Sequence, residues 1–202
     1  MSSETRARGG VAVLQEIFGV NAHIRAVTDK FAAEGYAALA PALFDRIERG
    51  VDLGYTDDAT AKGRALRGEL GYAAPMRDVA AAIAALLPSG KVGIVGYCWG
   101  GSLAWLAACR LSADCAACYY GAQIKDFLDE KPRCPVVMHF GERDALIPRE
   151  TVAAIRAAQP DVPVFAYPAG HGFNCDMRSD YDAACSALAF ARTLALLREC
   201  VG

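Results

Sequence analysis

The sequence predicts an α/β fold with a mainly parallel sheet covered by helices on both faces. Short apolar runs alternate with amphipathic stretches along the chain, which is typical of strands that alternate with helices. The runs end at glycine, proline or polar residues and are short enough to be buried strands. Apolar residues make up 54% of the chain, which is enough for a packed core.

Each element has an expected place. Buried strands are expected at residues 11–15, 36–40, 91–97, 115–120, 135–140 and 163–167. Helices are expected at residues 22–34, 76–87, 100–110, 148–158 and 181–199, and the polar segment 45–71 is expected to hold a loop and a helix. Ligands of such sheets bind at the carboxyl ends of the strands. The residues that directly follow each strand are therefore the candidates for chemistry.

Length and charge limit the classes of protein to consider. The 202 residues suit a single domain, 1–202, and show no repeat or linker. A formal net charge of −2 gives no indication of binding to nucleic acid or to an anionic membrane. Without a secretory signal or a long apolar span, a cytoplasmic protein is expected. Its eight cysteines are then expected to be free thiols.

Residues 92–101 carry the motif with the clearest chemistry. Gly96-Tyr97-Cys98-Trp99-Gly100 fits the nucleophile elbow G-x-S-x-G, with cysteine in place of serine. Small residues are needed around the nucleophile because the strand turns sharply into a helix there. The helix N-terminus favours a thiolate at Cys98 and directs the amide of Trp99 toward a developing oxyanion. Taken alone, the motif fits a buried structural thiol equally well.

Two later segments supply partners for this cysteine. Asp144 follows one expected strand in the segment F-G-E-R-D, and His171 follows the last strand in A-G-H-G-F. The order nucleophile, acid, histidine is that of α/β-hydrolases. His171 is positioned to take the proton of Cys98, and Asp144 to hold the imidazole in the right tautomer.

The remaining histidines and paired cysteines indicate no second site. His23 lies on an expected helix and His139 within an expected strand, so both are expected to be structural. Cys115 and Cys118 lie three apart in a strand and point to opposite faces. We therefore expect neither a metal nor a cofactor.

Taken together, these segments resemble the dienelactone hydrolase (carboxymethylenebutenolidase) family of α/β-hydrolases. The resemblance is carried by Q-E-I-F-G-V-N at 15–21, G-Y-C-W-G-G at 96–101, Y-Y-G at 119–121, G-E-R-D at 141–144 and A-G-H-G-F at 169–173. It extends from residue 11 to the C-terminal helix. The first two motifs together are specific, and they imply the α/β-hydrolase fold.

The resemblance also implies the catalytic roles. Cys98, His171 and Asp144 would form the triad, and Glu16 would help to generate the thiolate as substrate binds. A carboxylate directly after an apolar strand is costly to bury unpaired, which gives Glu16 a physical argument of its own. Its alternative role is to bond loop amides. The oxyanion hole would consist of two backbone amides, those of Ile17 and Trp99.

Substrate contacts follow from the same resemblance. Tyr120 and Phe173 are expected to contact the substrate. Relatives bind a substrate carboxylate with arginines, one of them soon after the catalytic histidine, and Cys175 stands at that place here. Arg178, one turn further on, is the expected substitute, with Lys62 or Arg64 as the second cation.

The N-terminus departs from the family pattern. Relatives begin with an extra pair of strands, and residues 1–10 are too short to supply them. We therefore expect these strands to be missing and a sheet edge to be left for a partner chain or for solvent. The expected assembly is a monomer or a weak homo-oligomer.

These features predict a hydrolase of a small activated ester or enol lactone, such as dienelactone, which it would open to maleylacetate. The reaction would pass through a thioester on Cys98. One alternative is a broader thiol-dependent carboxylesterase or lactonase. The other is a thiol-based sensor on a hydrolase scaffold, which would not turn over esters.

Overall fold

The sheet of this protein has six strands, and every neighbouring pair is parallel. In the computed structural model, which describes residues 7–202, the strand order is β2-β1-β3-β4-β5-β6. The strands are β1 Gly10–Leu14, β2 Ala37–Leu39, β3 Val92–Tyr97, β4 Cys115–Tyr119, β5 Val136–Gly141 and β6 Val164–Tyr167. The central strands β1, β3, β4 and β5 are buried along their whole length. The predicted parallel α/β architecture is confirmed.

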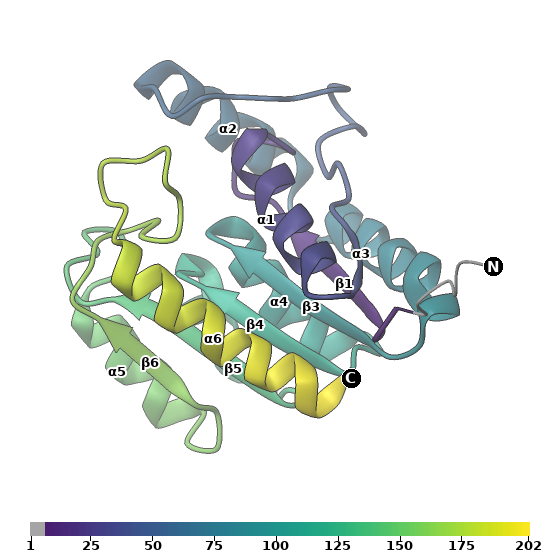
Figure 1. Cartoon of the computed structure of the whole chain (residues 1–202). Helices are drawn as coiled ribbons and strands as arrows, with labels where there is room; N and C mark the ends of the chain where they lie inside the picture. Colours follow the sequence, from purple (N-terminus) through teal and green to yellow (C-terminus); the bar gives the residue numbers. More distant parts are fainter. Residues whose placement is uncertain (1–6) are drawn as a thin grey trace.

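Helices cover both faces of the sheet. Figure 1 shows α1 (Ala22–Ala33) and α6 (Ala183–Cys200) in front of it, with α3 (Ala73–Leu86), α4 (Trp99–Arg110) and α5 (Arg149–Ala158) behind. The remaining helix, α2 (Asp57–Leu70), lies above the others at the end where β1 and β3 terminate. Short 3-10 turns occur at η1 (Leu87–Ser89) and η2 (Ala122–Phe127).

The predicted element boundaries are mostly correct to within three residues. Helix α3 begins at Ala73, three residues before the predicted start, because Pro75 fits the first turn, where backbone amides need no partner. The expected helix at 181–199 begins at Ala183 because the Asp182 side chain caps it by accepting from the Cys185 amide. The η2 turn was not predicted.

The outer edge of β2 has no neighbour within residues 7–202. The expectation that extra N-terminal strands are missing concerns residues 1–10, of which residues 7–9 form no strand. Residues 1–6 lie outside the described part of the chain.

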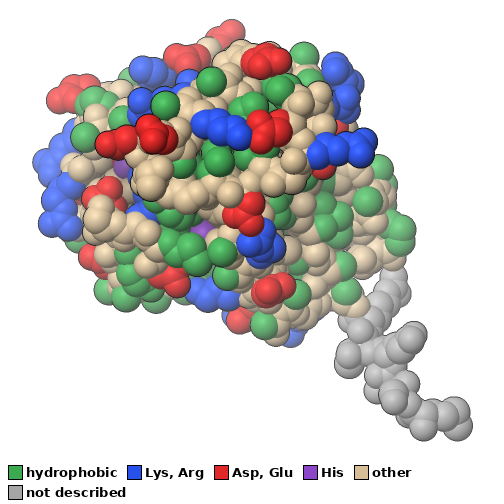
Figure 2. Space-filling view, turned by 90° about the horizontal axis from the view of Figure 1, so that it is seen from above, with side chains coloured by type: hydrophobic (Ala, Val, Ile, Leu, Met, Phe, Trp, Pro, Cys, Tyr) green, Lys and Arg blue, Asp and Glu red, His purple; other side chains and the backbone are tan. Residues whose placement is uncertain are grey.

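Basic and acidic side chains are interspersed on the face seen in Figure 2.

Within residues 7–202, no single helix is long and apolar enough to cross a bilayer. Segments 57–70 and 73–89 pass that test of length and composition only when taken together, and they are bent by 89° relative to each other.

The parallel arrangement brings four chain segments together at one end of the sheet. Glu16 follows β1, Cys98 follows β3, Asp144 follows β5 and His171 follows β6. In an open parallel sheet the carboxyl ends of the strands are where ligands bind. The candidate site therefore lies at this end, beneath α2.

Candidate active site

Cys98 occupies a strained turn between β3 and α4. Its backbone has φ 53° and ψ −116°, a conformation that residues with a side chain rarely adopt. The turn is held by a hydrogen bond from the Cys98 amide to the Tyr119 carbonyl (3.0 Å) and by one from the Ser102 amide to the Cys98 carbonyl (3.2 Å). This geometry lifts the sulfur out of the strand toward the open end of the sheet, where Cys98 is half-buried.

The glycines around Cys98 are required by space. A Cβ on Gly96 would lie 1.9 Å from the Gly100 carbonyl oxygen, and one on Gly100 would lie 2.3 Å from the Leu14 carbonyl oxygen. Both contacts are with backbone, which cannot move aside as a flexible side chain can. The two glycines of the elbow thus let β1, β3 and α4 approach closely.

Cys98, His171 and Asp144 form a continuous chain of side-chain contacts. Nε2 of His171 lies 3.3 Å from Sγ of Cys98, and Nδ1 lies 2.7 Å from Oδ2 of Asp144. The other carboxylate oxygen of Asp144 accepts from the amides of Leu146 (2.8 Å) and Ile147 (3.1 Å). Since the Asp144 side chain is fully buried and both its oxygens are engaged, it fixes the orientation of the imidazole.

The charge state of His171 is set by its two neighbours. Burial disfavours the protonated imidazole, but the Cys98 sulfur and the Asp144 carboxylate outweigh it and raise the pKa of His171 to about 10. At neutral pH the arrangement therefore favours an imidazolium beside the sulfur. Such an imidazolium can stabilise a thiolate and later release a proton.

The two amides expected in an oxyanion hole have no hydrogen-bond acceptor within residues 7–202. Trp99 is the first residue of α4, so its N–H has no acceptor within the helix. Ile17 lines the same cavity as Cys98, and within residues 7–202 its N–H donates no hydrogen bond to another residue. Both amides are thus free to bind an anionic oxygen.

Glu16 is buried next to this site and is held by two side chains. Tyr55 donates a hydrogen bond to Oε2 of Glu16 (3.1 Å), and Nη1 of Arg178 lies 3.4 Å from Oε1. Asn21 in turn donates to the Tyr55 hydroxyl (3.1 Å). The Glu16 side chain has no exposed surface, whereas the Arg178 side chain is 20% exposed and reaches the cavity. Arg178 thus links the buried carboxylate to the substrate space.

One group of side chains has the chemistry of metal ligands. Ligand atoms of Glu16, His23 and Cys175 lie within 4.8 Å of one another, and all three residues are buried. However, both oxygens of Glu16 are already bound, one of them by the cationic Arg178. Burial also raises the pKa of the Cys175 thiol to about 11, so the thiol remains protonated at neutral pH. A positive neighbour and a protonated thiol both oppose cation binding.

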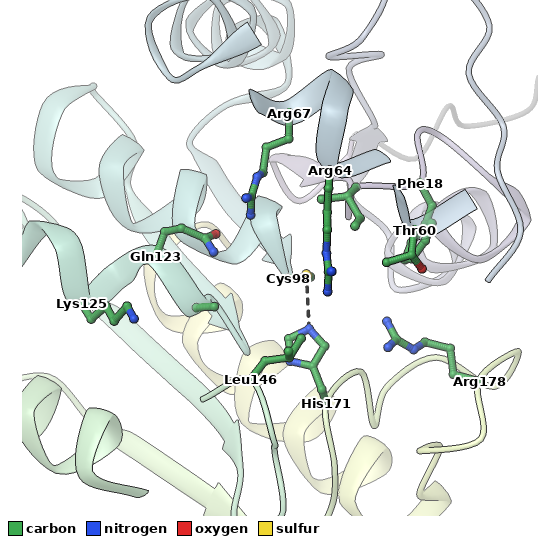
Figure 3. A pocket seen from close by; sticks show the side chains of 12 residues that line it. Phe18, Thr60, Arg64, Arg67, Cys98, Gln123, Lys125, Leu146, His171 and Arg178 are labelled. Carbon is green, nitrogen blue, oxygen red and sulfur yellow. Dashed lines mark hydrogen bonds between the residues drawn. The ribbon is translucent and has the colours of Figure 1, made fainter. Parts of the chain in front are cut away.

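A cavity of about 310 Å³ opens above Cys98 and His171. Its walls come from the loop after β1, from α2, from η2 and from the segments that follow β5 and β6. Figure 3 shows Arg64, Arg67 and Arg178 reaching toward the Cys98–His171 pair, with Lys125 farther to one side. The remaining lining residues are Ile17, Phe18, Thr60, Ala122, Gln123 and Leu146.

Tyr120 and Phe173 lie behind the cavity rather than in its wall. Both are fully buried, and the cavity lining includes neither. The Tyr120 ring packs on the His171 imidazole with ring centroids 5.1 Å apart, and Phe173 packs on Tyr120 at 5.5 Å. Both side chains thus pack behind His171 and not in the lining, where a direct substrate contact was expected.

The two alternatives for the second cation differ clearly in position. Lys62 donates to Glu48 (2.7 Å) outside the cavity, whereas Arg64 lines it. Thr60, Arg64 and Arg67 also share one face of α2, at spacings of four and three residues. That spacing was visible in the sequence, but it became informative only once α2 was placed over the site.

Tyr55, Arg67, Gln123 and Lys125 were missed by sequence reasoning. Arg67 could have been found from its helical spacing to Arg64. Tyr55 lies in a loop, and Gln123 and Lys125 lie in the η2 turn that was not predicted. No local pattern marks these three residues.

Comparisons with known proteins agree with the fold and show the family. The sequence profile of the dienelactone hydrolase family matches residues 2–201. A carboxymethylenebutenolidase of Pseudomonas putida is 36% identical, with 93% of this chain and 84% of the relative covered. A Synechocystis protein assigned the same activity is also 36% identical, over 93% of this chain and 85% of its own.

Solved structures give the same result. A Klebsiella pneumoniae protein assigned as a dienelactone hydrolase superposes with a TM-score of 0.81 at 28% identity, covering 96% of this chain and 88% of its own. The chain belongs to the dienelactone hydrolase family, whose members are hydrolases that act on ester and lactone bonds.

Proposed function

We propose that this protein hydrolyses a small anionic ester or enol lactone, of the dienelactone type, through a thioester on Cys98. The observation that carries the proposal is the contact chain from Sγ of Cys98 through His171 to Asp144, which opens into a cavity with cationic walls. The activity in the names of the Pseudomonas putida and Synechocystis relatives also supports it.

The first half-reaction forms the acyl-enzyme. The Cys98 thiolate attacks the carbonyl carbon, and the electron pair of the C=O bond moves onto oxygen. The amides of Ile17 and Trp99 bind this oxyanion, a contribution of about 3–4 kcal/mol per donor in comparable sites. The intermediate then collapses, the C–O bond to the leaving group breaks, and protonated His171 gives its proton to the departing oxygen.

The second half-reaction returns the enzyme to its starting state. His171, now neutral, takes a proton from water as the water oxygen attacks the thioester carbonyl. The second tetrahedral intermediate expels the Cys98 thiolate and releases the carboxylic acid. His171 is left protonated beside the thiolate, the pairing that its raised pKa favours. In an enol lactone both products remain in one molecule.

Glu16 and Arg178 would couple substrate binding to this chemistry. A substrate carboxylate that binds Arg178 competes with Glu16 for the guanidinium, since the two already lie 3.4 Å apart. Weakening of that ion pair would leave a buried carboxylate with one fewer cationic partner, and the added negative charge would favour transfer of the Cys98 proton to His171, since the imidazolium formed is a cation at the same site. In this proposal Glu16 assists formation of the thiolate only when an anionic substrate is present.

The choice of substrate separates this proposal from its closest rival. A broad thiol-dependent esterase would turn over neutral and anionic esters alike, whereas the cationic lining favours anionic ones. Membership of a hydrolase family argues against the sensor.

Steady-state hydrolysis of cis- and trans-dienelactone is the direct test. We expect ring opening by the wild-type protein and a rate at least about a hundredfold lower for Cys98→Ser, since a hydroxyl beside an arrangement built for a thiolate is a poor nucleophile. Near-full turnover by Cys98→Ser would overturn the thioester mechanism. Efficient turnover of 4-nitrophenyl acetate with none of dienelactone would favour the broader esterase.

A further inference from the structure

The charge on the cavity walls exceeds what a single substrate carboxylate needs. Four cations line the cavity, Arg64, Arg67, Lys125 and Arg178, and within the described residues no carboxylate does. Arg178 is balanced by Glu16 behind the wall. None of the ion pairs found in residues 7–202 involves the other three.

These cations lie on two sides of the reacting sulfur. In Figure 3, Arg67, Gln123 and Lys125 lie on one side of the Cys98–His171 pair, and Arg178 lies on the other. Arg64 extends between them, above Cys98. Arg67 and Lys125 come from different elements, α2 and η2, and both line the cavity.

We propose that Arg67 and Lys125, with Gln123 between them, form a second anion subsite, so that the preferred substrate carries two carboxylates that flank the scissile acyl group. The proposal rests on the ester hydrolysis proposed above and names its substrate class. Arg178 and Arg64 take the anionic group on one side, and Arg67 and Lys125 take the other.

Electrostatics support two anionic groups over one. Like charges that face a common space repel one another, and only a bound anion turns that repulsion into attraction. A monoanion held at Arg178 leaves the charges of Arg67 and Lys125 uncompensated on the far wall. Two carboxylates of one substrate also repel each other less when the reacting carbonyl separates them.

An ordinary solvated surface is the competing interpretation, because Arg64 and Lys125 are exposed and Arg67 is half-buried. Lys62 shows what such a residue looks like on the same helix: it points away from the cavity and pairs with Glu48 at 2.7 Å. Lys62→Gln is therefore the matched control for loss of a positive charge from α2.

Four chromogenic esters separate the two subsites. They are 4-nitrophenyl acetate (neutral), 4-nitrophenyl hydrogen adipate (acyl anion), 3-carboxy-4-nitrophenyl acetate (leaving-group anion) and 3-carboxy-4-nitrophenyl hydrogen adipate (dianion). For the wild type we expect the dianion to have the lowest KM. The double variant Arg67→Gln/Lys125→Gln should raise that KM by about tenfold, which is the scale of one charged hydrogen bond.

The pattern over the four esters decides the outcome. In the double variant, KM for one monoanion and for the dianion should rise, while kcat and KM for the neutral ester stay within about twofold. Lys62→Gln should change none of these kinetic constants. The proposal is overturned if the dianion binds no better than the better monoanion in the wild type. It is also overturned if the double variant affects all four esters equally.

Binding without turnover keeps this test separate from the proposed function. Calorimetric titration of the intact dianionic ester into the Cys98→Ala variant measures affinity alone. Here too the Arg67→Gln/Lys125→Gln change should weaken binding about tenfold. Absence of turnover of every ester by the wild type would overturn the hydrolase mechanism, whereas an unchanged titration would overturn the subsite.

Discussion

The two sides of the cavity are built in different ways. On the sheet side, Cys98 and Asp144 follow the buried strands β3 and β5, His171 follows β6, and backbone atoms leave no room for a Cβ at Gly96 or Gly100. On the α2 side, arginines project from an exposed helix, and a Cβ on Gly68 would meet nothing within 4 Å. The difference teaches that the core fixes the geometry on the sheet side. On the α2 side, the side chains that face the substrate can change without disturbing the core.

Asp144→Asn should have the largest effect. The amide cannot hold the protonated imidazole in place, so kcat should fall by about 10³- to 10⁴-fold while KM changes little. Steady-state kinetics on dienelactone, with circular dichroism to confirm folding, would measure this. A loss of less than tenfold would show that the sheet side does not fix His171 as described.

Gly100→Ala should strongly destabilise the elbow. Its Cβ would lie 2.3 Å from the Leu14 carbonyl oxygen, and we expect a loss of about 3 kcal/mol in the free energy of unfolding. Gly68→Ala on α2 is the matched control and should stabilise the helix by up to about 1 kcal/mol. Urea denaturation of both variants checks the contrast. Equal effects would remove the distinction between the two sides.

Arg64→Gln should act on binding rather than on rate. Loss of one cation from the cavity wall should raise KM for an anionic ester by about tenfold, with kcat nearly unchanged. KM for 4-nitrophenyl acetate should stay the same. A fall in kcat with no change in KM would place Arg64 in the chemistry and not in recognition.

The free energy of unfolding should fall at acid pH because of His139, which is buried in the sheet. Burial, with a smaller effect of Arg192, lowers the pKa of His139 to about 3, while the unfolded chain has an ordinary value near 6.5. Between these values the unfolded state binds more protons, so this contribution to stability is complete above about pH 6.5 and is lost as pH falls toward 3.

His139→Gln tests that dependence. The variant should be less stable at pH 8 but should lose stability less steeply below pH 6.5, by up to about 1.4 kcal/mol per pH unit. Chemical denaturation at pH 4, 5, 6 and 8 measures the slope. An identical slope for both proteins would mean that folding does not lower the pKa of His139.

The sequence was sufficient for the parts of the molecule that depend on local pattern. The strands and most helices follow from periodicity, and Cys98, Asp144 and His171 were found because each follows a strand at a glycine-containing turn. The partners of Glu16 were not predicted in full: Tyr55 is 39 residues away in the chain and reaches it through tertiary contacts alone.

Contacts across the cavity also could not be predicted from local sequence patterns. Tyr120 and Phe173 were expected at the substrate but pack behind His171, through contacts between the segments after β4 and β6 that lie far apart in the chain. Lys125 lies in an irregular turn with no periodicity, and its place opposite Arg178 depends on how η2 packs against α4.

The central claim, a covalent acyl group on Cys98, is tested most directly by rapid quenching. Enzyme mixed with excess 4-nitrophenyl acetate and stopped in acid within milliseconds should show a burst of nitrophenolate equal to the enzyme concentration. Its intact mass should increase by one acetyl group, mapped to the peptide that contains Cys98 and absent from Cys98→Ala. Unreduced turnover by Cys98→Ala, or an acetyl group on another residue of the active protein, would contradict the account.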